Sequence, residues 1–398
     1  MSMVRVKSVV RSVVEKACGI PQPFLGLEDL ESRTGRLLVE HLSHKAAEDS
    51  IRHAPGDVLF CKLRPYLAKS YLPTAPGTGT SELLVMRPGP EVDSRFLFYV
   101  TLSTPWVAWA DATAYGTKMP RTSWELVSDF RMFLPQLEQQ RRIANFLDAE
   151  ITRIDQLVTL RTRQVHLVEE KRASSLDASF ERDTHSPTRL KRLLTARPRY
   201  GVLVPQFTEG DGVRFIRVND LLDLSGRAES LRRIPRELSA QYLRTVTRPG
   251  DILLSVVGTM GRSAIVPPEL EGANIARAVA SLRPRSDVSA ELVAAWLTTP
   301  NFIRQAVCAT SSDTAQPTLG MEDLSNFELS WPSSLSAQRN LLQEVRTIQQ
   351  HCNRLVGAFQ TQSRLLSERR QALITAAVTG QFDVTTASGR NVTEGVSA

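Results

Sequence analysis

The chain of 398 residues contains the same succession of segments twice. PGDVLFCKLRPYLAKSYL from Pro55 matches PGDILLSVVGTMGRSAIV from Pro249, and EQQRRIANFLDAEITRIDQLV from Glu138 matches SAQRNLLQEVRTIQQHCNRLV from Ser336. Four further pairs of segments occur in the same order, and the offset between copies drifts only from 191 to 198 residues as loops change length. Such self-similarity constrains the fold more than any local pattern does. We therefore expect two modules that share one fold.

The globular part of each module combines short strands with helices. Alternating or β-branched runs bounded by Gly and Pro predict strands at 57–61, 83–86, 251–257 and 263–266. Helical stretches are expected at 96–110 and 290–307. The sequence thus predicts an α+β class protein, with a small domain in each module and a mostly antiparallel or mixed sheet.

A long amphipathic helix is predicted after each globular part. Residues 136–180 contain no Pro or Gly, and the second copy begins just after Pro332 and ends at Gly380. Apolar residues recur at alternating spacings of four and three, as in a coiled coil. The stripes are Ile143, Leu147, Ile151, Ile154, Val158, Val165 and Val168 in the first helix, and Leu341, Val345, Cys352, Val356, Phe359 and Leu366 in the second. Polar Gln349 and Ser363 occupy two seam positions of the second helix, which predicts a looser seam there.

An isolated helix of this length cannot bury its apolar stripe, so the two helices are expected to pack antiparallel in a pseudo-two-fold molecule. The predicted boundaries are a first domain at 1–135, a first spacer helix at 136–183, a second domain at 184–332, a second spacer helix at 333–382 and a flexible tail at 383–398. Two similar domains at the ends of a rigid rod resemble a caliper, and half-sites on duplex DNA are an object that it could measure. An adaptor whose coiled coil joins protein partners fits the same shape.

Composition and charge narrow the class of protein. Hydrophobic residues make up 42% of the chain, and no apolar run approaches the roughly 20 residues that cross a bilayer. Cys18, Cys61, Cys308 and Cys352 lie far apart without a CxxC pair, which predicts buried thiols. The net charge of +7 is distributed as +2 over residues 1–135, −1 over 136–185 and +3 over both 186–334 and the remainder. A modest, dispersed surplus favours a protein that positions itself on DNA over a purely electrostatic binder.

These features resemble the specificity subunit of type I restriction-modification enzymes, the HsdS family. The resemblance rests on the helical segments, which run from PQLEQQRRIANFLDAEITRIDQLV to SLDASF and end in SERRQALITAAVTGQFD in the second copy. It also rests on the PGDILLSVVGTMGRSAIV segment and on the GTKMP and DTAQP loops, which resemble target recognition domains. The order domain, spacer, domain, spacer covers the chain from about Val4 to Asp383.

The resemblance implies a DNA-recognition subunit without catalytic activity, in the cytoplasm of a bacterium or archaeon and without a membrane partner. Each domain would read one half of a bipartite, asymmetric site on double-stranded DNA. The spacers would dock two modification subunits that carry S-adenosylmethionine, and two restriction subunits with ATP and Mg would join them. No cofactor is expected in this chain. A stand-alone specificity protein without an active nuclease partner is the alternative.

Motifs of an enzymatic alternative are missing from the sequence. It contains no GxxxxGK[ST] phosphate loop and no NPPF or DPPY segment that would hold a flipped adenine. Glu169, Glu170 and Lys171 lie within a predicted helix, where a charged helix face is the simpler interpretation. His41, His44 and His53 could form a metal cluster, but solvated histidines are more common in such a polar stretch. We therefore expect neither a catalytic nor a metal site.

Base-reading side chains are expected in loops at equivalent places of the two copies, because Arg, Lys, Asn, Gln and small hydroxyls specify bases in the major groove. KLRPYLAK in the first copy corresponds to VVGTMGRS in the second, and unlike loops suit an asymmetric target. The candidates are Lys62, Arg64, Tyr66, Lys69, Tyr115, Lys118 and Arg121 in the first module, and Arg217, Asn219, Thr259, Arg262, Asn274, Arg277, Thr314 and Gln316 in the second.

Overall fold

The computed structural model describes residues 2–17, 22–45, 50–258, 260–310, 318–382 and 384. It divides the chain into two compact units, one formed by residues 1–162 with 360–398 and the other by residues 163–359. Two long helices, α5 (Leu137–Phe180) and α11 (Leu335–Val378), each contribute one part to each unit. Both helices contain 44 residues, and their ends correspond at the offset of 198 found in the sequence.

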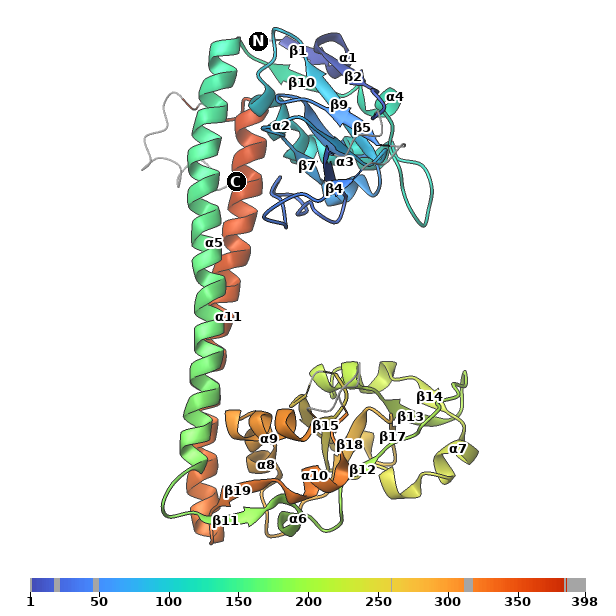
Figure 1. The fold of residues 1–398 in the computed structure, drawn as a ribbon, viewed down its shortest axis with the longest axis vertical. Helices are drawn as coiled ribbons and strands as arrows, with labels where there is room; N and C mark the ends of the chain where they lie inside the picture. The colour runs from blue at the N-terminus through green and yellow to red at the C-terminus, as the bar shows by residue number, and fades with distance from the viewer. Residues whose placement is uncertain are drawn as a thin grey trace. The chain divides into compact units, whose positions relative to one another are not determined.

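The globular part of unit 1 has two four-stranded sheets, one of which packs against a helix (Figure 1). Its strands are β1 (Ser2–Arg5), β2 (Val10–Val13), β3 (Gln22–Leu25), β4 (His44–Lys45), β5 (Ile51–His53), β6 (Val58–Cys61), β7 (Ser70–Tyr71), β8 (Gly77–Gly79), β9 (Leu83–Pro88) and β10 (Arg131–Leu134). Its helices are α1 (Val6–Val9), the 3₁₀ turn η1 (Pro65–Leu67), α2 (Ser94–Leu102), α3 (Thr104–Ala112) and α4 (Trp124–Val127). The sheet β2-β9-β6-β7 is antiparallel, whereas β4-β3-β8-β5 contains the parallel pair β3 and β8.

Unit 2 repeats most of this topology. Its strands are β11 (Ser186–Arg189), β12 (Arg199–Tyr200), β13 (Val213–Ile216), β14 (Arg233–Ile234), β15 (Ile252–Ser255), β16 (Ser263–Ile265), β17 (Asn274–Ile275), β18 (Val279–Leu282) and β19 (Glu328–Trp331). Its helices are α6 (Leu190–Leu193), η2 (Val218–Leu222), η3 (Ala228–Ser230), α7 (Arg236–Ala240), η4 (Leu243–Thr245), η5 (Pro268–Leu270), α8 (Ala290–Trp296), α9 (Pro300–Thr310) and α10 (Met321–Asn326). The sheet β12-β18-β15-β16 corresponds to β2-β9-β6-β7, and β14-β13-β17 corresponds to β4-β3-β8, with β13 and β17 again parallel. No strand among the described residues of unit 2 takes the place of β5. The predicted α+β class with mixed sheets is therefore confirmed.

The parts of α5 and α11 within each unit run antiparallel. In unit 1, the ring of Phe146 on α5 lies 5.6 Å from the ring of Phe382, and Asp155 of α5 pairs with Arg370 of α11. A later residue of α5 thus meets an earlier residue of the second copy, as antiparallel packing requires. In unit 2, Arg182 pairs with Glu344, and Arg172 bonds to Asn353. Predicted seam residues join the cores of their own units, as Ile143 and Leu147 do in unit 1 and Leu341 and Val345 in unit 2. Buried apolar area of this kind stabilises helices that would be marginal alone.

Two predictions about the helices need correction. The stretches at 96–110 and 290–307 are each broken into two helices, α2 with α3 and α8 with α9. Pro105 and Pro300 explain the breaks, because each lies in the first turn of the second helix, where its missing N–H leaves a carbonyl of the preceding helix without a donor. Of the cysteines that the structure describes, Cys61 and Cys352 are buried as predicted, but Cys308 is exposed.

Candidate nucleic-acid interface

The seven candidates of the first module lie on two loops that are hydrogen-bonded to each other. One loop follows β6, and the other lies between α3 and α4. The Thr122 amide donates to the Lys62 carbonyl at 2.9 Å, and the Arg64 amide donates to the Pro120 carbonyl at 2.7 Å. Tyr115 and Arg121 exchange both of their backbone hydrogen bonds, which closes the second loop. The two loops, 62–69 and 115–121, thus form one surface, which we call the paired-loop surface.

Four of these candidates, Arg64, Tyr66, Tyr115 and Lys118, are exposed on the paired-loop surface. Aromatic and cationic groups that stand free of the protein can stack on or hydrogen-bond with nucleotides. Their placement fits the role expected from the sequence.

The other three candidates hold the loops in place. The Lys69 ammonium donates to the Leu27 carbonyl at 2.6 Å, and the Arg121 guanidinium donates to the Glu82 carboxylate at 2.7 Å. Lys62 is half-buried, and burial lowers the pKa of its ammonium although the nearby Glu82 opposes that shift. Lys69 and Arg121 thus have protein partners that a base contact would have to replace.

Backbone conformation in the first loop is unusual at two positions. Arg64 has φ 50° and Ala68 has φ 47°, both in the left-handed region that residues with a Cβ rarely adopt. Such conformations cost about 1–3 kcal/mol each and persist only when their surroundings impose them. The imposed conformation sets how Arg64 and Tyr66 project from the surface.

In the second module three candidates lie at one edge of the parallel strand pair. Arg217 directly follows β13, and Arg277 follows β17 by two residues. The Ala276 amide donates to the Ile216 carbonyl at 2.9 Å, which continues the pairing past the strand ends. Arg217, Asn219 and Arg277 are exposed there, with the Arg217 Nε 3.3 Å from an Asp220 carboxylate oxygen. Arg262 lies half-buried just before β16, and its carbonyl accepts from the Ser255 amide.

Asn274 does not fit a base-reading role, because its side chain is fully buried. Its amide oxygen accepts from the Thr245 hydroxyl at 3.0 Å, and its amide nitrogen lies 3.2 Å from the Ser239 hydroxyl. The sequence predicts a surface group at this strand end, whereas the side chain satisfies buried hydrogen-bonding groups. Thr259, Thr314 and Gln316 lie outside the described residues.

Further residues that the sequence did not single out lie at the paired-loop surface and at the edge of the β13–β17 pair. The Arg33 guanidinium donates to the Tyr66 carbonyl at 3.0 Å and so supports the first loop from a distant segment. In the second module Leu203 and Val204 are 54% and 68% exposed, beside Val202, whose carbonyl accepts from the Arg277 amide. Apolar groups at such a place can contact thymine methyl groups. The sequence signal for them is the run of three apolar residues between Gly201 and Pro205.

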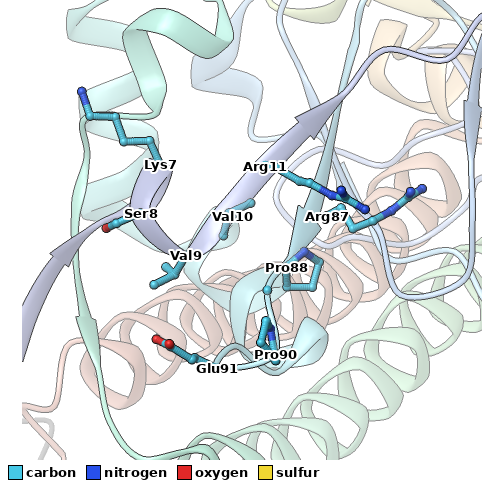
Figure 2. A pocket seen from close by; sticks show the side chains of 10 residues that line it. Lys7, Ser8, Val9, Val10, Arg11, Arg87, Pro88, Pro90 and Glu91 are labelled. Atoms are coloured by element: carbon cyan, nitrogen blue, oxygen red, sulfur yellow. The ribbon is translucent and has the colours of Figure 1, made fainter.

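A pocket of about 450 Å³ lies in unit 1 at the junction of β2 and β9, where none of the candidates is found. Figure 2 shows Arg11 and Arg87 extending in one direction, whereas Lys7 points away from them. Arg87 is held by Asp57, with Nε to Oδ1 at 2.6 Å, and Glu91 adds a carboxylate to the lining. A guanidinium already neutralised in this way offers little to an anion.

Within the described ranges, no group of three His, Cys, Asp or Glu residues is arranged to hold a metal ion, and no helix is long and apolar enough to cross a membrane. His53 is buried, contrary to the expectation of a solvated side chain, and burial lowers its pKa.

The fold and the loops together define a class of protein, in which two related loop-bearing modules are built on two shared helices. A chain of a type I restriction-modification system, solved to explain its complex assembly and conformational transition, has this fold with a TM-score of 0.70. It is 22% identical, and the match covers 96% of this chain and 98% of that one. The HsdS subunit from Thermoanaerobacter tengcongensis aligns over 96% of this chain with a TM-score of 0.49 and 22% identity.

In sequence the chain is similar to the type I restriction enzyme EcoBI specificity subunit of Escherichia coli. The two are 27% identical over 299 residues, which make up 68% of this chain and 62% of that protein. No family model matches the chain. The resemblance to type I specificity subunits that the sequence predicted is thus confirmed.

Proposed function

We propose that this chain is the DNA-recognition subunit of a type I restriction-modification complex. Each module would read one half of a bipartite, asymmetric site on double-stranded DNA. The chain would supply recognition without catalysis. Two modification subunits would bring S-adenosylmethionine, two restriction subunits would bring ATP and Mg, and the assembly would work in the cytoplasm.

The observation that carries this proposal is that two modules of similar fold present different loops. The modules share sheet order and buried hydrogen bonds, but the loop after β6 presents Arg64 and Tyr66, whereas the corresponding loop after β15 has Arg262 as its basic residue. Two readers with different side chains on one scaffold suit a target with two different halves. The sequence similarity to the EcoBI specificity subunit supports the same class.

Mapping methylated adenines by long-read sequencing tests the proposal. Cells that express the modification subunits with this chain should methylate a motif of two short specified segments separated by unspecified bases. Cells with the modification subunits only should lack that motif. A methylation pattern that is the same with and without this chain would contradict the proposal, and a single continuous motif would contradict the bipartite part of it.

A further inference from the structure

A buried arginine joins helix α11 to the globular part of unit 1. Arg370 is 6% exposed and is the one Arg or Lys among the described residues that is classed as buried. Its guanidinium donates to the Arg33 carbonyl at 2.6 Å and to the Thr34 carbonyl at 2.7 Å. Its Nε lies 3.3 Å from the carboxylate of Asp155 on α5. A buried guanidinium needs this full set of partners, and its planar fork fixes their positions relative to the helices.

The segment that Arg370 holds, at Arg33 and Thr34, also supports the 62–69 loop of the paired-loop surface. Arg33 has φ 65°, so this bend is also a left-handed one. The Arg33 amide donates to the Ala68 carbonyl at 3.2 Å, and its guanidinium donates to the Tyr66 carbonyl at 3.0 Å. An ion pair therefore joins Asp155 to Arg370, and a continuous series of hydrogen bonds runs from Arg370 through the 33–34 backbone to Tyr66 and Ala68.

The second module has the same pair in a different form. At the offset of 198, Arg370 corresponds to Arg172 and Asp155 corresponds to Asn353. These two residues also meet, with Arg172 donating to the Asn353 amide oxygen at 3.2 Å, but the contact is exposed and carries no ion pair. No other hydrogen bond of the Arg172 side chain occurs within the described part of unit 2. The connection from helix to recognition loop is thus a feature of the first module.

We propose that Arg370 is a positioning residue for DNA recognition by the first module. With Asp155 it fixes the 31–36 segment, which in turn holds the Arg64–Ala68 loop in its left-handed conformation. The inference rests on the proposed function, because it assumes that this loop reads DNA. It predicts that discrimination between bases at one half-site depends on a side chain of the spacer helix that lies outside the reading surface.

Arg370→Lys tests the inference in the complex with modification subunits. Lysine keeps the charge but lacks the fork that serves two carbonyls and a carboxylate together. The measurement is the ratio of Kd for DNA with one substituted base pair to Kd for the preferred DNA, at each position of both half-sites. The half-site of the first module is the one at which Arg64→Ala lowers this ratio. There, Arg370→Lys should lower the ratio at least about five-fold, the lower end for loss of a well-placed base contact, and leave the other half-site unchanged.

Two further variants separate positioning from a general effect on folding. Arg33→Ala removes an exposed side chain and its bond to Tyr66, but keeps the carbonyls that Arg370 binds, so it should lower the same ratio without changing the unfolding temperature. Arg172→Lys is the matched control and should change neither half-site.

Each outcome has a distinct meaning. Equal loss at both half-sites in Arg370→Lys, or full discrimination in both Arg370→Lys and Arg33→Ala, would overturn the inference. A wild-type complex that shows no base preference would overturn the proposed function itself.

Discussion

The two modules share two sets of buried polar contacts and differ at many of their exposed side chains. In each, an Asp that follows a left-handed Gly accepts a backbone hydrogen bond and a two-pronged contact from an Arg. Asp57 pairs with Arg87 at 2.6 and 2.8 Å, and Asp251 pairs with Arg283 at 2.7 and 2.6 Å. The preceding glycines have φ 85° and 86°, a conformation that glycine adopts without penalty.

A second shared contact joins each long helix to its globular part. Gln140 of α5 accepts from the Asp93 amide at 2.8 Å and donates to the Glu91 carbonyl at 2.8 Å. Gln338 of α11 does the same with the Ser289 amide and the Asp287 carbonyl, at 3.1 and 3.0 Å. Buried polar groups are costly to leave unpaired, so both copies retain these partners, whereas exposed side chains are free to diverge. Under the proposed function, this divergence would give the two modules different specificities.

The largest expected effect is loss of the shared Asp and Arg pair. Asp57→Ala and Asp251→Ala should each destabilise their own unit by about 3 kcal/mol, the lower end for a broken buried pair, because the Arg partner is partly exposed. Urea unfolding gives the total loss, and hydrogen exchange assigns it to a unit. Asp287→Ala, at an ion pair with both side chains 53% exposed, is the control that should change little. A large loss in only one unit would show that the common contacts are not energetically equivalent.

A smaller effect is expected from the readers themselves. Arg64→Ala and Arg262→Ala should each weaken DNA binding by about 1–3 kcal/mol if the lost contact is bidentate, and each at its own half-site. Binding to DNA with either half-site scrambled measures which half is affected. Arg153→Ala, on an exposed face of α5, is the control. Equal weakening at both half-sites by either variant would mean that these residues contact phosphate and not bases.

The sequence predicted the repeating parts well and the loops poorly. Strict apolar periodicity located a helix at 136–180, and α5 spans Leu137–Phe180, because a seven-residue pattern is a property of neighbouring residues. The approach of Pro120 to Arg64 and the burial of Asn274 depend on contacts between distant segments, which no local pattern specifies. The same holds for Arg33 and Arg370, whose roles depend on carbonyls that any residue would provide.

A pH-dependent difference between the modules is expected at one buried position. His53 in unit 1 corresponds to Thr247 in unit 2, whose hydroxyl donates to the Leu270 carbonyl at 2.6 Å. Burial lowers the pKa of His53 below its ordinary value of 6.5, so the unfolded chain binds the proton more readily. Stability of unit 1 should therefore fall as the pH falls through that ordinary value.

His53→Thr should remove this part of the pH dependence, since it gives unit 1 the side chain that unit 2 has. The measurement is the urea midpoint for unfolding of unit 1, followed by hydrogen exchange. It is repeated at several pH values from about 7.5 to about 5.5, on either side of the histidine pKa. A wild type and a variant with the same slope would show that His53 does not titrate differently on folding.

The smallest expected effect concerns an ion pair whose charges are exchanged between the modules. Arg95 of α2 pairs with Asp148 of α5 at 2.8 Å, and the corresponding Glu291 of α8 pairs with Arg346 of α11 at 2.7 Å. Each globular part therefore meets an opposite charge on its own helix segment, and an exchange of partners would place Arg95 beside Arg346 and Glu291 beside Asp148. Like charges at such a contact oppose the wrong pairing of globular part and helix segment. The charges would thus act on the choice of partner more than on stability.

Glu291→Arg and Arg346→Glu test this in unit 2. Each single variant should lower the urea midpoint slightly, and the double variant should recover it, because the double restores an opposite pair. The recovery should shrink at high salt, since both side chains are about half exposed, at 48% and 47%. If the urea midpoint of the double variant is no higher than those of the single variants, the loss comes from packing of the two side chains and not from their charges. The exchange of signs between the modules then has no role in matching each domain to its helix.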